Sequence, residues 1–515
     1  MPKIKIDGKE VEVVPGTRVI DACDHEGLDI PRFCYHPGLT PAGNCRMCLV
    51  KVSNSRKLEV SCVYPCSEGL EVTTSGPEVE AGRKAVLEYM LINHPLDCPI
   101  CDKAGECQLQ DNTAEHRDGL TRFVDPKVVK DTKDLGPQIK IWGSRCISCT
   151  RCVRFCEEVV GTGELAMTQR GDHQVADVHP EIPLDNPMSL NVVDICPVGA
   201  LIDKDFLYAS RVWFTKRTDT VCAGCSKGCN IVATVHQNDI KRVQPRENHA
   251  VNHYWMCDAG RQGLDYVKGP NRLKLHRGDR KTLAAKLSAI AARGPARVGI
   301  LASTYATVEE AYLLKQVADQ LGARVGFIGR GGDEWTAKNG WKIEADKTPN
   351  RAGVAMVFGA VEGPEAILAG VQSGAIQALL VVNGMPGATY APELLAAAKK
   401  LELLAVCDIE KSPLSEAAHV VIASTTWAEK DGVYVNSTGR VQRIQPLIVS
   451  QGQARSDVAT LQEILVGLGV RRAVLSTEAV FTEAVPALDY AKVGSQGVVL
   501  ASSPEATTTV SLGAK

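Results

Sequence analysis

The first residues of the chain alternate between charged and apolar side chains. Residues 3–14, KIKIDGKEVEVV, therefore predict two short strands, and Asp7-Gly8 is a typical hairpin turn between them. Residues 17–26 then have helical spacing, and Gly27 indicates where that helix ends. The chain is expected to begin with a small domain built from a hairpin, a helix and a loop.

The second half of the chain has a different pattern. After residue 270, fully apolar segments alternate with Ala-rich stretches of helical spacing, which favours a doubly wound parallel sheet. The clearest strand candidates are residues 297–303, 375–384 and 403–409. The last fifteen residues, ASSPEATTTVSLGAK, are rich in Ser and Thr and are expected to be disordered.

Length and composition narrow the class of protein. A chain of 515 residues is too long for one core and indicates about three or four domains. Its apolar content of 44%, charged content of 23% and net charge of -2 favour neither nucleic acid nor an anionic membrane surface. The start has no signal-peptide pattern, and no apolar run approaches the ~20 residues of a membrane span. We therefore expect a soluble intracellular protein.

Cysteine is the exceptional residue. The chain has 19 cysteines, and only Cys407, expected in a core, lies beyond residue 260. In an intracellular chain this clustering favours metal ligands over disulfides. The first candidate set follows the spacing C-x10-C-x2-C-x13-C, and its members are Cys34, Cys45, Cys48 and Cys62.

Four thiolates on this frame suit a [2Fe–2S] cluster, with a zinc site as the alternative. The small-residue loop 43–48 can fold around a cluster, and its backbone N–H groups can hydrogen-bond the sulfurs. Cys62 is preferred to Cys66 as the fourth ligand because it follows a predicted strand at 58–60. Cys23 lies on the face of the first helix and is expected in the core.

The second candidate set contains a histidine. Residues 79–94 have helical spacing, and Pro95 predicts that this helix ends at His94. The spacing H-x3-C-x2-C-x5-C then places the imidazole at the rim of a loop, and the other members are Cys98, Cys101 and Cys107. We expect a [4Fe–4S] cluster with one imidazole ligand; a zinc site, or a histidine that only caps its helix, is the alternative.

The third candidate set resembles a bacterial ferredoxin motif. Cys146, Cys149, Cys152 and Cys156 have the spacing C-x2-C-x2-C-x3-C, and Cys196-Pro197 follows. In two-cluster ferredoxins the fourth cysteine of such a run ligates the other cluster. We therefore expect one [4Fe–4S] site from Cys146, Cys149, Cys152 and Cys196, with an exchange of Cys156 for Cys196 left open.

The fourth candidate set is Cys222, Cys225, Cys229 and Cys257, spaced C-x2-C-x3-C-x27-C around a hairpin predicted to turn at Asn238-Asp239. It resembles the [4Fe–4S] cap at the start of molybdopterin-dependent oxidoreductases. Residues 425–442 also look like part of that family. Only about 250 residues follow the cap, which is short for a molybdopterin enzyme, and GRGGDEW (329–335) is too irregular for a nucleotide-binding loop.

The order of these four sites resembles the G, or large iron–sulfur, subunits of bacterial NADH:quinone oxidoreductases (respiratory complex I), over roughly residues 1–445. The resemblance implies one [2Fe–2S] and three [4Fe–4S] clusters on the sixteen residues named above, and no molybdenum or pterin. It implies an electron relay from the NADH and flavin subunit toward quinone, without a catalytic residue on this chain. Expected partners are the flavin subunit, a small [2Fe–2S] subunit, a two-cluster ferredoxin-like subunit and the quinone-site subunits, on the cytoplasmic face of the bacterial inner membrane.

The predicted fold class is multidomain α+β. Its expected segments are a [2Fe–2S] ferredoxin-like β-grasp domain (1–78), a domain for the histidine-containing site (79–120), a ferredoxin-type [4Fe–4S] domain (121–215), a molybdopterin-family cap (216–272), a truncated molybdopterin-oxidoreductase-like α/β domain (273–450) and a partly disordered C-terminal extension (451–515).

Three redox classes share features of the first 215 residues. An NAD-linked [FeFe] hydrogenase needs further cysteine motifs, and a formate dehydrogenase needs a catalytic Cys or selenocysteine with a longer pterin-binding half. The diaphorase subunit of an NAD-reducing [NiFe] hydrogenase is expected to stop near residue 240. A zinc-bound scaffold is the non-redox alternative.

Overall fold

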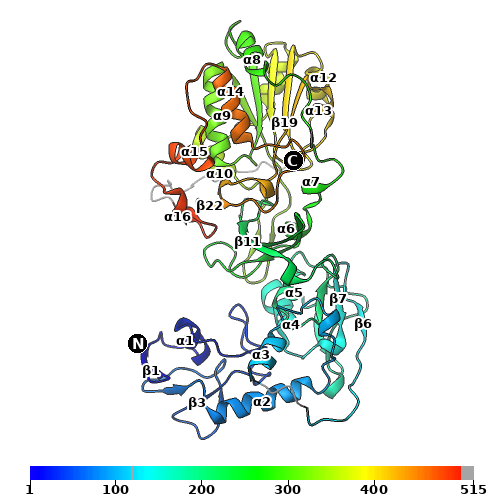
Figure 1. Cartoon of the computed structure of the whole chain (residues 1–515), viewed down its shortest axis with the longest axis vertical. Helices are drawn as coiled ribbons and strands as arrows, with labels where there is room; N and C mark the ends of the chain where they lie inside the picture. The colour runs from blue at the N-terminus through cyan, green and yellow to red at the C-terminus, as the bar shows by residue number, and fades with distance from the viewer. Residues whose placement is uncertain (117–120, 500–515) are drawn as a thin grey trace. The chain divides into compact units, whose positions relative to one another are not determined.

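The computed structural model describes residues 1–116 and 121–499, which form two units. The first unit comprises residues 1–215 with 336–341, and the second comprises residues 216–335 with 342–515 as far as they are described (Figure 1). The Ser/Thr-rich tail, for which disorder was predicted, lies outside the described residues. Among the described helices, none is both long and apolar enough to cross a membrane.

The first unit begins with a five-stranded mixed sheet in the order β2-β1-β5-β3-β4. The predicted hairpin is confirmed, because β1 and β2 pair antiparallel around Asp7 and Gly8, which both have positive φ. β5 pairs parallel with β1 and antiparallel with β3. The bounds are β1 Lys3–Ile6, β2 Lys9–Glu12, β3 Leu49–Val52, β4 Glu59–Val60 and β5 Glu71–Thr73.

Two helices accompany this sheet. α1 (Val19–His25) lies within the predicted range, and it buries Cys23 in the core as expected. α2 (Pro77–Leu91) begins two residues before the predicted range, with Pro77 in its first turn, where the missing N–H is not needed. The prediction that it ends at His94 is wrong, because it ends at Leu91 and leaves His94 in the following loop.

The rest of the first unit consists of short elements separated by loops. β10, β7 and β6 form a three-stranded sheet, and β8 pairs with β9. The strand bounds are β6 Thr132–Asp134, β7 Ile139–Trp142, β8 Leu165–Thr168, β9 Val175–Val178 and β10 Leu201–Asp203. The helices are α3 Gln108–His116, α4 Arg151–Arg154 and α5 Asn191–Ile195, with a π-helical turn η3 at Phe155–Val160 and shorter turns η1 Cys98–Ile100, η2 Gly143–Arg145, η4 Gly171–His173 and η5 Val212–Phe214.

The second unit begins with an antiparallel three-stranded sheet, β11 (Lys216–Val221), β12 (Asn230–His236) and β13 (Asp239–Pro245). Its predicted hairpin is present, but the turn lies one residue earlier than predicted, at Gln237 and Asn238, which both have positive φ. Two short helices follow, α6 (Ala259–Gln262) and α7 (Asp265–Lys268).

The predicted parallel sheet is confirmed. Its order is β15-β14-β18-β19-β20, with every neighbouring pair parallel. The strands are β14 Val298–Ser303, β15 Arg324–Ile328, β18 Ala378–Val382, β19 Leu403–Asp408 and β20 Val420–Ala423. Alternate residues enter two separate cores, one shared with α8, α9 and α14 and the other with α11, α12 and α13 (Figure 1). Helices therefore cover both faces, and Cys407 on β19 is buried as predicted.

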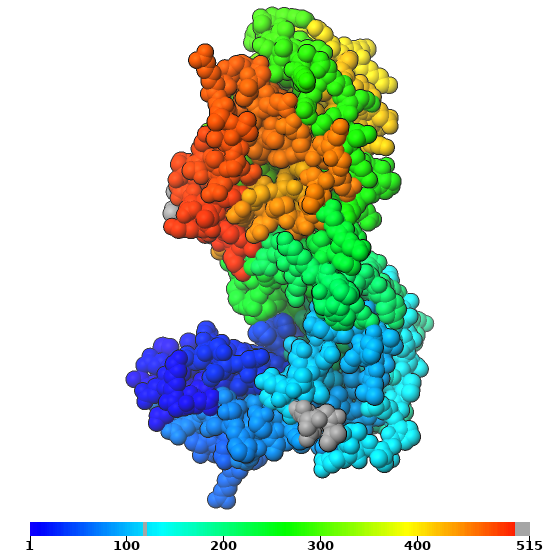
Figure 2. Space-filling view, viewed as in Figure 1, coloured from blue at the N-terminus to red at the C-terminus, as the bar shows by residue number. Residues whose placement is uncertain are grey.

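The helices around this sheet are α8 Leu283–Ala291, α9 Val308–Leu321, α10 Arg351–Phe358, α11 Glu365–Gln372, α12 Pro392–Ala398, α13 Pro413–Ala417, α14 Asp457–Gly467, α15 Thr477–Ala484 and α16 Tyr490–Val493. The remaining short elements are β16 Trp335–Thr336, β17 Lys342–Ile343, η6 Trp427–Glu429, β21 Gly432–Val435, β22 Arg440–Ile444 and β23 Val498–Val499. Residues 451–499 contribute to the core: Leu461 and Leu465 of α14 pack with the sheet residues. The orange and red residues in Figure 2 show this segment lying along the second unit.

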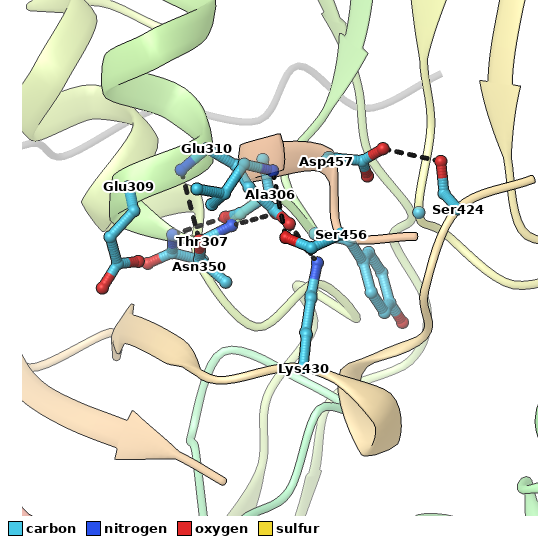
Figure 3. Close-up of polar contacts among 12 residues, drawn as sticks. Ala306, Thr307, Glu309, Glu310, Asn350, Ser424, Lys430, Ser456 and Asp457 are labelled. Atoms are coloured by element: carbon cyan, nitrogen blue, oxygen red, sulfur yellow. Dashed lines mark hydrogen bonds and ion pairs between the residues drawn. The ribbon is translucent and has the colours of Figure 1, made fainter. Parts of the chain in front are cut away.

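Buried polar contacts fix the N-terminus of α9 (Figure 3). Thr307 and Glu310 form a capping box, in which each side chain accepts a hydrogen bond from the other residue's backbone N–H. Lys430 Nζ donates to both carboxylate oxygens of Glu310, at 2.9 and 2.8 Å. Close by, Ser424 donates to Asp457 at 2.6 Å. A buried charge is costly unless it is paired, and the Lys430–Glu310 ion pair meets this requirement.

Candidate metal centres

The first candidate set comes together at the edge of the N-terminal sheet. The backbone N–H of Cys34 points to Cys45 Sγ at 3.4 Å. Side-chain hydrogen bonds from Cys45 and Cys62 lower the pKa of the Cys34 thiol, and contacts with Cys34 and Cys48 raise the pKa of Cys62. Backbone N–H groups of the 43–48 loop also approach the sulfurs, as the sequence suggested. Four convergent thiols with N–H donors are a donor set that fits an iron–sulfur cluster.

Cys66 lies apart from this set. Its backbone N–H donates to Thr17, and its thiol is buried in the core of the N-terminal domain. Burial raises the pKa of Cys66 to about 11, with a further contribution from Asp21 and none from the four convergent thiols. The structure therefore brings Cys62, and not Cys66, to the other three.

The second set lines a small cavity formed by the loop after α2, the start of α3, Arg145 and Gly199. His94, Cys98, Cys101 and Cys107 all border it. His94 Nδ1 is buried and has no hydrogen-bond partner. Burial, together with smaller contributions from Lys127 and Arg145, lowers the pKa of His94 to about 4. A neutral imidazole with a free buried nitrogen fits a metal ligand, and it does not fit a histidine that caps the helix.

Two further residues, Gly199 in the wall of this cavity and Pro197 close to it, could not be predicted from the cysteine spacing. A Cβ on Gly199 would lie 2.1 Å from Cys101 Sγ, so only glycine allows the 196–200 segment to close over the thiol. The carbonyl of Pro197 accepts the Gln108 N–H at 3.1 Å, next to Cys107. The 196–200 segment thus supplies Cys196 to the third set and, through Gly199, part of the wall of the cavity at the second set.

The third set gathers around the start of α4. Ser148 N–H approaches Cys146 Sγ at 3.4 Å. Burial is the main cause that raises the pKa of Cys149 to about 12, and the charges of Cys196 and Cys146 contribute to this rise. Burial also raises the pKa of Cys152, with smaller contributions from Cys149, Cys146, Cys196 and, least, Cys156.

The fourth set lies in the second unit, beside the β11–β13 sheet. Cys222 Sγ accepts from the Gly224 N–H at 3.4 Å, and the Cys222 N–H donates to the Cys229 carbonyl at 2.9 Å. A Cβ on Gly260 would lie 3.1 Å from Cys222 Sγ and 3.5 Å from Cys257 Sγ. Glycines that let the backbone approach buried thiolates suit a cluster cradle. Among the described residues, no group of three or more His, Cys, Asp or Glu side chains is placed so that it could hold a single metal ion.

Comparison with known proteins gives five matching families along the chain. They are a 2Fe-2S iron-sulfur cluster binding domain (residues 2–77), the NADH-ubiquinone oxidoreductase-G iron-sulfur binding region (83–117), the NADH-quinone oxidoreductase subunit 3 ferredoxin-like domain (136–202), the molybdopterin oxidoreductase Fe4S4 domain (215–269) and molybdopterin oxidoreductase (324–466). Curated relatives agree with these matches. The G subunit of NADH-quinone oxidoreductase is 39% identical in Rickettsia felis and Rickettsia bellii and 38% identical in Rickettsia prowazekii, over 62–63% of this chain.

The chain is a homologue of the NADH-quinone oxidoreductase G subunit. It spans about half the length of these relatives, 50% in Rickettsia felis and 49% in the other two. A solved structure, "Crystal structure of NAD+-reducing [NiFe]-hydrogenase in the H2-reduced state", is 28% identical with a TM-score of 0.38, and it covers 41% of this chain and 91% of that one.

In this G-subunit homologue, Cys156 lies beside Glu164, and of the third set's thiols it acts on Cys152. Burial is the main cause that raises the pKa of Cys156, and Glu164 raises it further through its charge and a side-chain hydrogen bond. The carbonyl of Cys156 accepts the N–H groups of Gly161 and Thr162 at the end of the π-helical turn. The residue is buried, and among the described thiols of the third set it acts on Cys152 alone, whereas Cys196 contributes to the raised pKa of Cys146, Cys149 and Cys152.

Two arginines of α4, Arg151 and Arg154, could not be identified as functional residues from the sequence. Arg151 donates to the carbonyls of Ile195, at 3.0 Å, and Tyr35, at 2.6 Å. Burial lowers the pKa of Arg151, while thiolates of the third set and of the first set raise it. Arg154 donates to the carbonyls of Cys34 and, at 3.5 Å, Cys149. Their positions in the ferredoxin motif gave no signal, because the contacts that join them to the first set are made with residues more than 100 positions earlier.

Proposed function

We propose that this chain is the electron-relay iron–sulfur subunit of an NADH:quinone oxidoreductase. The observation that carries the proposal is the set of four separate donor groups, one of which contains a buried imidazole whose Nδ1 has no partner. Iron–sulfur clusters, when bound, accept and donate single electrons at potentials that the protein adjusts. The chain's own residues supply ligands, backbone N–H donors and burial. None of them acts as an acid, a base or a nucleophile.

The proposed ligands are those predicted from spacing. A [2Fe–2S] cluster is assigned to Cys34, Cys45, Cys48 and Cys62. Three [4Fe–4S] clusters are assigned to His94 with Cys98, Cys101 and Cys107; to Cys146, Cys149, Cys152 and Cys196; and to Cys222, Cys225, Cys229 and Cys257. The α/β part of the second unit would serve as a scaffold without molybdenum or pterin. The six predicted segments, with boundaries at residues 78, 120, 215, 272 and 450, are kept as the domain proposal.

The proposal also places the chain within a larger assembly. Electrons would arrive from an NADH-oxidising flavin subunit with its small [2Fe–2S] partner and leave toward a two-cluster ferredoxin-like subunit and the quinone-site subunits. The whole complex would couple this transfer to proton translocation. The chain would lie in the peripheral arm, on the cytoplasmic side of a bacterial inner membrane, and touch the membrane only through its partners.

Iron and acid-labile sulfide analysis of the anaerobically reconstituted chain, with EPR spectroscopy, tests the proposal. We expect about fourteen iron atoms per chain from the four ligand sets, with a [2Fe–2S] signal and [4Fe–4S] signals on reduction. Stoichiometric zinc with little iron would contradict the proposal and support the zinc scaffold.

Two matched pairs of variants test the ligand assignment. Cys62→Ser should remove the [2Fe–2S] signal, whereas Cys66→Ser should keep it, because none of the four proposed ligand thiols contributes to the pKa of Cys66. Cys196→Ser should remove one [4Fe–4S] signal, whereas Cys156→Ser should keep it. The opposite result in either pair would show that the assignment of that site is wrong.

A further inference from the structure

Two buried arginines lie between the first and third candidate sites. Arg151 is 5% exposed and Arg154 is 9% exposed, and both are on α4, which also carries Cys152. Arg151 donates to the carbonyl of Tyr35, which follows ligand Cys34, and to that of Ile195, which precedes ligand Cys196. The Arg151 guanidinium therefore contacts the backbone beside both sites.

Arg154 makes the same kind of contact more directly. Its Nη2 donates to the carbonyl oxygens of two proposed ligands, Cys34 of the first site and, at 3.5 Å, Cys149 of the third. Two more contacts join the same segments: Asn44 Nδ2 donates to the Ser148 carbonyl at 3.3 Å, and Thr40 N–H donates to Glu158 at 2.8 Å. The two loops that hold the sites are thus fixed to each other.

Neither arginine forms an ion pair with a carboxylate among residues 1–116 and 121–499. Arg151 Nε is buried without a hydrogen-bond partner. A buried cation is costly without a counter-charge, and the anionic groups that act on Arg151 are thiolates of both sites.

We propose that Arg151 and Arg154 form a shared cationic clamp, which joins the first and third sites and raises the reduction potential of the clusters at both. This inference rests on the proposed function, because it requires clusters at these sites. In a titration, dithionite supplies one electron to each cluster, and each cluster with its thiolates then becomes one charge more negative. A fixed positive charge in a poorly solvated position stabilises the reduced form more than the oxidised form. Both potentials should therefore depend on the same two residues.

The test is an anaerobic redox titration of the reconstituted full-length chain, followed by low-temperature EPR. Arg151→Gln and Arg154→Gln should each make reduction at the first and third sites at least tenfold less favourable, which is about 59 mV for a one-electron couple. Arg151→Lys keeps the charge and should stay within about threefold of the wild type. A purely structural role would change cluster occupancy and leave the potentials of loaded clusters unchanged. The Cys62→Ser and Cys196→Ser variants identify the two signals.

Arg211→Gln is the matched control. Arg211 also donates to the carbonyl of a proposed ligand, Cys101 of the second site, at 2.7 Å, and it has no contact with the first or third site. This variant should leave the potentials of the first and third sites unchanged.

The outcomes separate the clamp from the proposed function. Loaded clusters with unchanged potentials in Arg151→Gln and Arg154→Gln overturn the clamp alone, whereas a wild-type chain without clusters overturns the proposed function. A shift at only one of the two sites also overturns the shared role. If Arg151→Gln does not take up its clusters, Arg154→Gln decides, since it keeps Arg151 and the hydrogen bonds of Arg151 to both sites.

Discussion

At the scale of single residues, His94 shows how far spacing alone can lead. The sequence placed it with Cys98, Cys101 and Cys107, and the structure brings all four to one cavity. The sequence did not predict the helix end correctly, because Pro95 only limits how far a helix can extend and α2 stops at Leu91. Gly199 could not be assigned either, since its role depends on a tertiary contact with a cysteine 98 positions earlier.

His94→Cys should make the cluster at the second site harder to reduce. A thiolate is charged and the imidazole is neutral, so the substitution adds negative charge to the ligand set. The cluster should still assemble, since thiolate is a competent ligand and the residue lies in a loop. The measurement is a redox titration by low-temperature EPR.

The control for this substitution is His173→Cys, which adds a thiol at an exposed position and should leave every potential unchanged. An intact cluster with an unchanged midpoint potential in His94→Cys would mean that His94 is not a ligand.

At the scale of secondary-structure elements, the sequence predicted the parts governed by local periodicity. The N-terminal hairpin, α1 and the central parallel strands follow from alternation, turn residues and apolar runs. The turn at Gln237 and Asn238 was predicted one residue too late, because Asn238 and Asp239 are both typical turn residues. The buried ion pair at the start of α9 had no local signal, because Lys430 and Glu310 are 120 positions apart in the sequence.

Glu309, in the first turn of α9, should make stability depend on pH. Burial raises the pKa of its carboxyl to about 8, from an ordinary value of 4.5, and one of its oxygens has no partner. Between about pH 4.5 and 8 the folded chain keeps a proton that the unfolded chain loses. The contribution of this group to the free energy of unfolding is therefore complete below pH 4.5 and falls as pH rises to 8, by up to about 1.4 kcal/mol per pH unit.

Glu309→Gln cannot ionise, so its stability relative to the wild type should increase from pH 6 to pH 8. The measurement is the urea midpoint of the second-unit transition at both pH values. Glu365→Gln, at the exposed start of α11, is the control and should follow the wild type. Parallel pH profiles for the wild type and Glu309→Gln would contradict a protonated Glu309.

At the scale of the whole molecule, the two units divide the chemistry unequally. The first unit holds three of the four candidate sites, and its short elements and loops are arranged around cysteines. The second unit holds the fourth site and a doubly wound sheet with apolar cores on both faces. The order of the four sites can be read from the sequence and carries the family resemblance, whereas the contacts between separate segments, such as those of Arg151 and Arg154, became visible only in three dimensions.

The second unit should bind neither molybdenum nor tungsten, although residues 324–466 match the molybdopterin oxidoreductase family. Beyond the fourth site, the only cysteine in the sequence is Cys407, and its thiol is 1% exposed within the sheet core, where it cannot reach a cofactor without unpacking β19. This region therefore has no accessible thiolate or selenolate that could bind molybdenum or tungsten. Elemental analysis of the chain expressed with added molybdate or tungstate should find iron and neither of these metals. One molybdenum or tungsten atom per chain, retained through gel filtration, would overturn the scaffold role proposed for this half.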